Sequence, residues 1–207
     1  MPAKKYHHGD LKNALIQAGI EILSKEGAAG LSLREVAKRA GVSHSAPYSH
    51  FQDKQSLISA IATEGLRQLY AEMQAAILPH ADDPKRQLIE GTWAYAQFAL
   101  NHTDTFRVVF SIVLEEESDY PAFVEISRKT FGLVMDSVRA CQARGLMRPA
   151  PPELIAVSLW GQVHGILSLV LDGQLPPALR ERYEIRQMVS MAIELMTQDA
   201  GEIHPKP

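Results

Sequence analysis

The fold is decided by the stretch Ser32–Phe51, which reads SLREVAKRAGVSHSAPYSHF. Ser32 and Glu35 have the spacing of a capping box, in which the serine hydroxyl accepts from the Glu35 amide while the glutamate reaches back to the first turn. Gly41 then ends a first short helix, because glycine readily adopts the left-handed conformation that follows many helices. Ser43 supplies the N-cap of a second helix, so the stretch predicts two short helices joined by a tight turn.

Two short helices joined by a glycine-containing turn make a helix-turn-helix. The predicted pair covers residues 32–40 and 43–50, and the second helix is too short and too polar to be a core helix. Small polar side chains let a helix enter a DNA major groove, about 12 Å wide, and bring donors and acceptors to the base edges. The pattern by itself is also compatible with a plain helical hairpin inside a bundle.

Outward from this stretch, apolar residues recur at helical spacing and strand-like alternation is rare. The pattern predicts further helices at residues 10–27, 54–77, 84–100, 103–112, 121–143, 152–171 and 184–197. The predicted fold class is therefore all-α, with about nine helices. We expect a DNA-binding domain at residues 1–54, an effector-binding and dimerisation domain at 55–200, and a disordered tail at 201–207.

Charge is distributed unevenly between the two predicted domains. Residues 1–54 hold eight basic and five acidic residues, a net charge of +3, whereas the remainder holds 13 basic and 19 acidic residues, a net charge of −6. A basic head on an acidic body fits a polyanion-binding module joined to a body that does not bind polyanions. The chain is 46% hydrophobic and 22% charged, which fits a folded globular protein rather than a disordered one.

Several features of the sequence argue against other settings. The sequence contains no run of 18 apolar residues, so we expect no membrane-spanning helix. An apolar stretch does not follow the basic N-terminus, so we expect no signal peptide. Cys141 is the single cysteine, which excludes an internal disulfide and fits a reducing cytoplasm. The histidines have no converging ligands nearby in the sequence, so we expect neither a metal site nor a cofactor.

Beyond the pattern itself, the run from Leu31 to Ser43, the segment Tyr48–Phe51 and the segment Asp53–Leu57 together resemble the signature of the tetracycline-repressor (TetR) family. The resemblance implies a three-helix DNA-binding head, an all-α effector-binding body, and a homodimer whose two recognition helices read a palindromic operator. By match to that motif, the candidate DNA contacts are Ser43, His44, Ser45, Ala46, Tyr48, Ser49, His50 and Lys54. We add Ser32, at a helix start that favours phosphate, and Lys5, in a basic N-terminal arm.

One position departs from the family pattern. Members commonly carry a small residue or threonine and then leucine before the tyrosine, whereas this chain has Ala46 and Pro47. A proline in the first turn of the reading helix removes one backbone hydrogen bond and fixes the local backbone angle. The bases that the helix reads are therefore not transferable from other members.

The predicted body is rich in aromatic and sulfur-containing side chains on its middle helices. These are the candidate lining of a small-molecule effector pocket, since such pockets are largely apolar with a few polar groups. The candidates are Trp93, Phe98, Phe106, Phe110, Phe131, Met135, Trp160 and His164, together with Tyr95. The same residues also fit a plain hydrophobic core.

Trp160 and His164 lie four residues apart on one helical face, and Gly165 follows directly. This resembles the Trp…His-Gly element in the C-terminal domain of one TetR subgroup. A histidine at this place fits a ligand contact, a contact to the partner subunit, or a hydrogen-bonded core position, and the sequence leaves all three open.

The last two long helices are the candidate dimer interface. One carries a stripe with small residues that permit close approach of another helix, and the other offers a complementary apolar face. The interface candidates are Val157, Gly161, Gly165, Ser168, Met188, Met191 and Leu195. With their symmetry mates they would form a four-helix interface, and the family places its dimer contact on these helices too.

These observations predict a DNA-binding transcription regulator, in the simplest form a repressor that a small-molecule effector releases from its operator. An enzyme is the first alternative, but the sequence contains no nucleophile–base–orienter set, glycine-rich phosphate loop or metal-ligand spacing. A helical adaptor for other proteins is the second alternative. Steep weakening of binding by salt separates a DNA-binding protein from such an adaptor.

Overall fold

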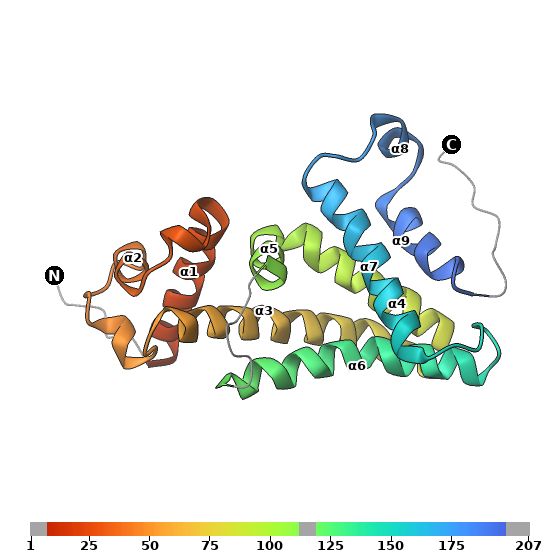
Figure 1. Ribbon diagram of the computed structural model, residues 1–207, viewed down its shortest axis with the longest axis horizontal. Helices are drawn as coiled ribbons and strands as arrows, with labels where there is room; N and C mark the ends of the chain where they lie inside the picture. The colour runs from red at the N-terminus through yellow and green to blue at the C-terminus, as the bar shows by residue number, and fades with distance from the viewer. Residues whose placement is uncertain (1–7, 112–118, 198–207) are drawn as a thin grey trace. The chain divides into compact units, whose positions relative to one another are not determined.

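The computed structural model of the chain describes residues 8–111 and 119–197, and the regular structure in these ranges is helical, as the all-α prediction requires (Figure 1). The helices in chain order are α1 (His8–Gly30), α2 (Leu33–Arg39), the 3-10 helix η1 (Ala46–Ser49), α3 (Lys54–Ile77), the 3-10 helix η2 (Leu78–His80), α4 (Pro84–Asn101), α5 (Thr103–Ser111), α6 (Pro121–Ala143), α7 (Pro152–Leu171), α8 (Pro177–Arg182) and α9 (Ile185–Glu194). Three parts of the predictions lie outside the described residues: Lys5, residue 112 at the end of a predicted helix, and the tail 201–207.

The chain divides into two compact units. Unit 1 comprises residues 1–67 and 104–127, and unit 2 comprises residues 68–103 and 128–207. Helices α3 and α6 each contribute one part to unit 1 and another part to unit 2. This division into compact units does not test the functional domains predicted from the sequence, residues 1–54 and 55–200, which remain a prediction.

Side-chain caps explain where the helices of both units begin. The Ser32 hydroxyl accepts from the Glu35 amide at 3.1 Å and starts α2. At α3 the Asp53 carboxylate accepts from the Ser56 amide at 2.8 Å, while the Ser56 hydroxyl accepts from the Asp53 amide at 3.1 Å. The Asp83 carboxylate caps α4 in the same way, at 3.0 Å. These bonds satisfy amides that a helix start leaves unpaired, so the predicted starts of α2, α3 and α4 are confirmed. Of these starts, only α3 has reciprocal bonds: at α2 the Glu35 carboxylate pairs with Lys38 at 3.5 Å and does not complete the predicted capping box.

The end of α2 fixes the turn of the helix-turn-helix. Gly41 has φ of 68°, in the left-handed region that disfavours other residues. Its amide donates to the Lys38 carbonyl at 3.2 Å, and the Val42 amide donates to the Ala37 carbonyl at 3.0 Å. This pair of bonds is a Schellman motif, which turns the chain sharply after α2.

The second helix of the predicted pair differs from the expectation. Instead of an α-helix over residues 43–50, the structure has the four-residue 3-10 helix η1. Ser43 is not its N-cap; the N-cap is Ser45, which makes no capping bond through its side chain. Pro47 accounts for the difference, because it has no amide hydrogen and disfavours the α conformation of the residue before it.

The C-terminal part holds a second difference. Between the predicted helices 152–171 and 184–197 the structure has a further helix, α8, which begins at Pro177, and the last helix ends at Glu194 rather than near residue 197. Proline at the first helical position is preorganised for a helix and gives up no bond there. Thr197 instead pairs with Met147 in an isolated antiparallel bridge, so the chain has left the helix by that point.

The core of unit 1 holds the helix-turn-helix together. Leu15 of α1, Val36 of α2 and Leu57 of α3 are fully buried and belong to one hydrophobic cluster with Phe51, which follows η1. Val108 of α5 belongs to the same cluster. Helices this short are not stable by themselves, so α2 and η1 depend on this shared apolar core.

In unit 2, α4, α7 and α9 pack against one another. Phe98, Leu159, Val163 and Ile193 are buried on these three helices. Among the described helices, α7 alone has the length and mean hydropathy that a membrane span would need. On one side of α7 five residues are buried within this unit: Ile155, Ala156, Leu159, Val163 and Leu167.

Candidate nucleic-acid interface and ligand site

The residues predicted to contact DNA around η1 lie at the surface of unit 1. Ser43, His44, Ser45, Tyr48 and Ser49 are exposed, while Ala46 and His50 are half-buried. The Tyr48 side chain is 62% exposed, whereas Phe51 is only 3% exposed. Phe51 packs in the core, and Tyr48 is left for a partner outside the protomer.

The backbone around η1 is held by local bonds. The amides of His50 and Phe51 both donate to the Pro47 carbonyl at 2.9 Å, and the Ser49 hydroxyl donates to the Ala46 carbonyl at 2.7 Å. Pro47 itself is buried. Among the described residues nothing accepts from or donates to the Tyr48 hydroxyl, which leaves it available to a phosphate oxygen.

Lys54, a predicted DNA contact, makes a hydrogen bond within the protein. Its ammonium group donates to the Ala28 carbonyl, which lies in the last turn of α1 just after the non-helical Gly27. Lys54 thereby ties the start of α3 to the end of α1. Ser32 likewise serves as the cap of α2, so both residues have structural duties inside unit 1.

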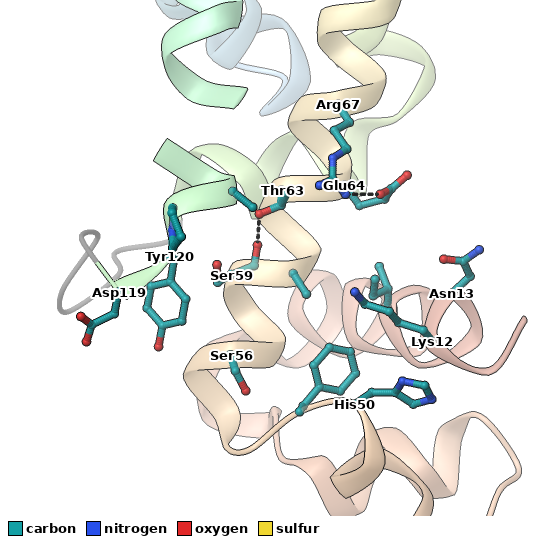
Figure 2. Close-up of a pocket in the computed structure, with 15 residues that line it drawn as sticks. Lys12, Asn13, His50, Ser56, Ser59, Thr63, Glu64, Arg67, Asp119 and Tyr120 are labelled. Atoms are coloured by element: carbon teal, nitrogen blue, oxygen red, sulfur yellow. Dashed lines mark hydrogen bonds and ion pairs between the residues drawn. The ribbon is translucent and has the colours of Figure 1, made fainter. Parts of the chain in front are cut away.

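Figure 2 shows a pocket of unit 1 that borders the end of η1. It has a volume of about 420 Å³ and is lined from α1, α3 and the start of α6, together with His50 and Phe51. Polar groups on α3 line the wall, including Thr63, whose hydroxyl donates to the Ser59 carbonyl at 2.6 Å (Figure 2). The pocket is therefore lined in part by the two residues that directly follow η1.

In unit 2, Trp160 and His164 both contact the hydroxyl group of Tyr95, and all three are candidate effector-binding residues. The Trp160 indole donates to the Tyr95 oxygen at 3.1 Å, and the same oxygen lies 2.7 Å from Nδ1 of His164. The indole nitrogen can only donate, so the Tyr95 oxygen accepts from it and directs its own proton to His164. His164 in its neutral form therefore carries its proton on Nε2. Burial lowers the pKa of His164 and raises the pKa of Tyr95, and these shifts keep both groups neutral.

The other predicted pocket residues fall into separate places. Phe131 meets the edge of Trp160, with ring centres 6.4 Å apart, and so joins the Tyr95 group. Phe106 and Phe110 pair with each other at 4.8 Å in unit 1. Phe98 and Met135 are buried in unit 2. That these residues bind an effector remains a prediction.

A second pocket of unit 2 lies between α4, the end of α7, α8 and α9, with a volume of about 430 Å³. Its lining is Trp93, Leu100, Val170, Leu175, Arg180, Tyr183, Glu184, Ile185, Arg186 and Met188. Only Trp93 belongs to the effector residues predicted from the sequence. Of the others, Leu175, Arg180 and Tyr183 lie between the predicted helices 152–171 and 184–197, and Pro177 was the one signal that a helix begins there.

The predicted dimer residues on α7 share an exposed face. Val157 is 46% exposed, and Gly161 and Gly165 have open space where a side chain would stand. Leu154 is 60% exposed on the same helix, and Leu195 of α9 is 59% exposed. Ser168, Met188 and Met191 are half-buried. Exposed apolar side chains beside glycines fit a helix that packs on a partner, and the dimer itself remains a prediction.

Comparison with known proteins identifies the family. Residues 15–61 match the family model of bacterial regulatory proteins of the tetR family. Residues 88–192 match the tetracyclin repressor-like C-terminal domain, so this model covers half of the chain. The first match spans the helix-turn-helix and the second spans most of unit 2.

Curated relatives agree with the family models. The chain is 35% identical over 97 residues to the class A tetracycline repressor of Escherichia coli, covering 46% of this chain and 43% of that protein. It is 21% identical over 154 residues to the transcriptional regulator HbdR of Aromatoleum sp. strain CIB, covering 74% of this chain and 67% of that regulator. The match therefore spans less than half of the class A repressor.

Solved structures share the fold. A protein of unknown function from Rhodococcus sp. RHA1 aligns with a TM-score of 0.75 at 29% identity, covering 93% of this chain and 96% of that one. A TetR family transcription regulator from Marinobacter aquaeolei VT8 aligns with a TM-score of 0.73 at 17% identity, covering 90% and 95%. Sequence models, relatives and fold agree, and the chain belongs to the tetR family of bacterial regulatory proteins, which are DNA-binding transcription regulators.

Proposed function

We propose that this protein is a homodimeric repressor that binds a palindromic operator and is released by a small-molecule effector. The observation that carries DNA binding is the surface of η1, where an exposed tyrosine and small polar side chains stand on a buried proline and phenylalanine. Side chains of this size enter a major groove without bulk, and their hydroxyl and imidazole groups reach base edges and phosphates.

In the proposed complex each protomer places η1 and its flanks, residues 43–50, in a major groove. The dimer sets the two helices about 34–36 Å apart, one turn of DNA, or slightly more. Tyr48 and Lys5 contact phosphates. Lys54 donates to the Ala28 carbonyl in the free protein and can share its remaining ammonium hydrogens with a phosphate.

The dimer is proposed to form through α7 and α9. Open space above Gly161 and Gly165 lets a second helix approach the backbone closely, and the exposed Leu154, Val157 and Leu195 supply apolar area to bury. Isologous contacts of this kind place the same face of both protomers against each other. Such a four-helix interface also accounts for the high hydropathy of α7.

The effector is proposed to bind in unit 2, near the hydroxyl group that Tyr95, Trp160 and His164 share. DNA and effector would then compete through a two-state equilibrium of the protomer. Two structural features support transmission. Helix α3 contributes residues to both units, and the pocket in Figure 2 joins α3 and the start of α6 to the residues after η1.

We place the protein in the cytoplasm and assign it no catalytic activity, because the family and the fold are those of transcription regulators. The single cysteine, Cys141, is buried, and burial raises the pKa of its thiol to about 11. A protonated buried thiol is a poor nucleophile, which agrees with a non-catalytic role.

The test is a mobility-shift assay on DNA selected from a random pool by the purified protein. Tyr48→Ala should weaken operator binding at least tenfold, because it removes the exposed aromatic and its phosphate contact. Its unfolding free energy should change by less than about 0.5 kcal/mol, because the side chain is mostly outside the core.

Tyr48→Phe is the matched control, since it keeps the ring and isolates the hydroxyl. Lys54→Ala is a poorer probe, because it also removes the bond to the Ala28 carbonyl. Wild-type binding should weaken steeply as salt rises. Salt-insensitive binding, or full affinity in folded Tyr48→Ala, would sink the proposed surface.

A further inference from the structure

The pocket between α4, α7, α8 and α9, here called the α8 cavity, combines an apolar wall with charged residues at α8 and α9. Trp93, Leu100, Val170, Leu175 and Met188 supply the apolar wall. Its volume of about 430 Å³ lies in the range of small-molecule sites, about 300–1,000 Å³.

Two of the three charged side chains in the lining have hydrogen-bond partners within the protein. The Arg186 guanidinium lies 2.8 and 3.0 Å from the two carboxylate oxygens of Glu90 and 5.3 Å from the centre of the Trp93 ring. Glu90 also pairs with Arg86 at 2.7 Å. The Glu184 carboxylate accepts from the Gln187 amide in the capping box of α9.

Arg180 is the exception. It lies on α8, it is exposed, and among the described residues no carboxylate lies within ion-pair distance of its guanidinium. A cationic side chain without a protein partner, beside an apolar wall, matches a ligand that carries a negative charge at one end. Tyr183 also lines the cavity, and its phenol is a hydrogen-bond donor suited to the same end.

We propose that the α8 cavity binds a small amphipathic carboxylate. The carboxylate pairs with Arg180, and a guanidinium offers it two parallel N–H donors. The apolar body lies against Trp93, Leu175 and Met188. A cationic amphiphile is disfavoured by Arg180, and a neutral one lacks the ion pair.

This site is distinct from the Tyr95, Trp160 and His164 group, and its occupancy does not depend on the proposed release from DNA. Met188 belongs to the proposed dimer face as well as to the cavity. A bound carboxylate therefore lies beside that face, so the test uses the full-length protein in its own oligomeric state.

The experiment exploits the two tryptophans of the chain. In Trp160→Phe protein, Trp93 is the sole tryptophan and reports on the α8 cavity. We expect octanoate to change its fluorescence saturably, with affinity above that for octanol and for octyltrimethylammonium. Arg180→Gln should weaken octanoate binding about tenfold, the effect of one charge-assisted hydrogen bond, and leave octanol binding unchanged.

Arg148→Gln is the matched control, because Arg148 is also exposed in unit 2 but does not line the cavity. Circular dichroism confirms that each variant is folded. Equal affinity for octanoate and octanol in the parent protein, or unchanged octanoate affinity in folded Arg180→Gln, overturns the proposal. A signal that appears only in Trp93→Phe protein, where Trp160 alone reports, places the ligand elsewhere and also overturns it.

A mobility-shift assay run in parallel separates this result from the proposed function. Octanoate binding without any DNA binding would refute the repressor and leave the α8 cavity as a carboxylate site. Operator binding without octanoate binding would support the repressor and refute the carboxylate site in the α8 cavity.

Discussion

The η1 surface of unit 1 and the α7 face of unit 2 are both exposed, yet their chemistry is opposite. Around η1 the exposed side chains are serines, a histidine and Tyr48, whereas α7 exposes Leu154, Val157 and Leu169 beside two glycines. Hydrated polar groups at the first surface are suited to exchange water for a polyanion. Apolar groups at the second gain free energy only when another apolar surface covers them.

Exposure alone does not define a functional surface. A polar surface that stands on a rigid core suits DNA, and an apolar face with open glycine positions suits a second helix. If the two surfaces act separately, a change under one should leave the function of the other intact, and variants can break this separation or sharpen it.

The largest expected effect comes from the core beneath η1. Phe51→Ala should lower the unfolding free energy by about 3–5 kcal/mol, because Phe51 is 3% exposed within the cluster of unit 1. Operator binding should be lost, while the oligomeric state measured by analytical ultracentrifugation should not change. Loss of the dimer in this variant would show that the two surfaces are not separate.

The converse change is Gly161→Glu on α7. The protomer has open space at this position, so its fold should tolerate the glutamate, whereas a packed partner helix would not. We expect a monomer by ultracentrifugation and operator binding at least tenfold weaker, because a monomer engages one half-site. Gly161→Ala controls for helix propensity, which favours alanine by about 1 kcal/mol. A stable Gly161→Glu dimer would contradict the proposed interface.

A smaller effect compares equivalent caps in the two units. Ser32→Ala and Asp83→Ala each remove one side-chain bond at a helix start and should each cost about 1 kcal/mol in chemical denaturation. Only Ser32→Ala should also weaken operator binding, because α2 contacts η1. Equal loss of operator binding in both variants would show that general stability, rather than local geometry, limits DNA binding.

The smallest effect concerns pH. Burial lowers the pKa of His164 below its ordinary value of 6.5, so the unfolded chain takes up this proton more readily than the folded one. The unfolding free energy should therefore fall as pH drops below 6.5 and continue to fall until the folded pKa is passed. His164→Gln should reduce this slope relative to the wild type in denaturation at several pH values. An unchanged slope would mean that burial does not hold His164 neutral in the folded protein.

Local patterns determined much of this protein. Ser32, Gly41, Asp53 and Asp83 fix helix ends through bonds between near neighbours in the chain, and all four places were predicted correctly. The 3.6-residue periodicity of apolar side chains likewise placed α3, α4, α6 and α7. The family signature lies in the same local stretch, so the DNA-binding role was also accessible from the sequence.

Tertiary structure decided what depends on distant partners. Because of Pro47, residues 46–49 form the 3-10 helix η1 where the sequence predicted an α-helix. The burial of Phe51 among residues of α1, α2 and α3 holds η1 in place. The meeting of Tyr95 with His164, 69 residues away, follows from the packing of α4 on α7. The α8 cavity likewise exists because α8 and α9 return to α4, and no local pattern specifies which side chains such long-range packing brings together or leaves without a partner.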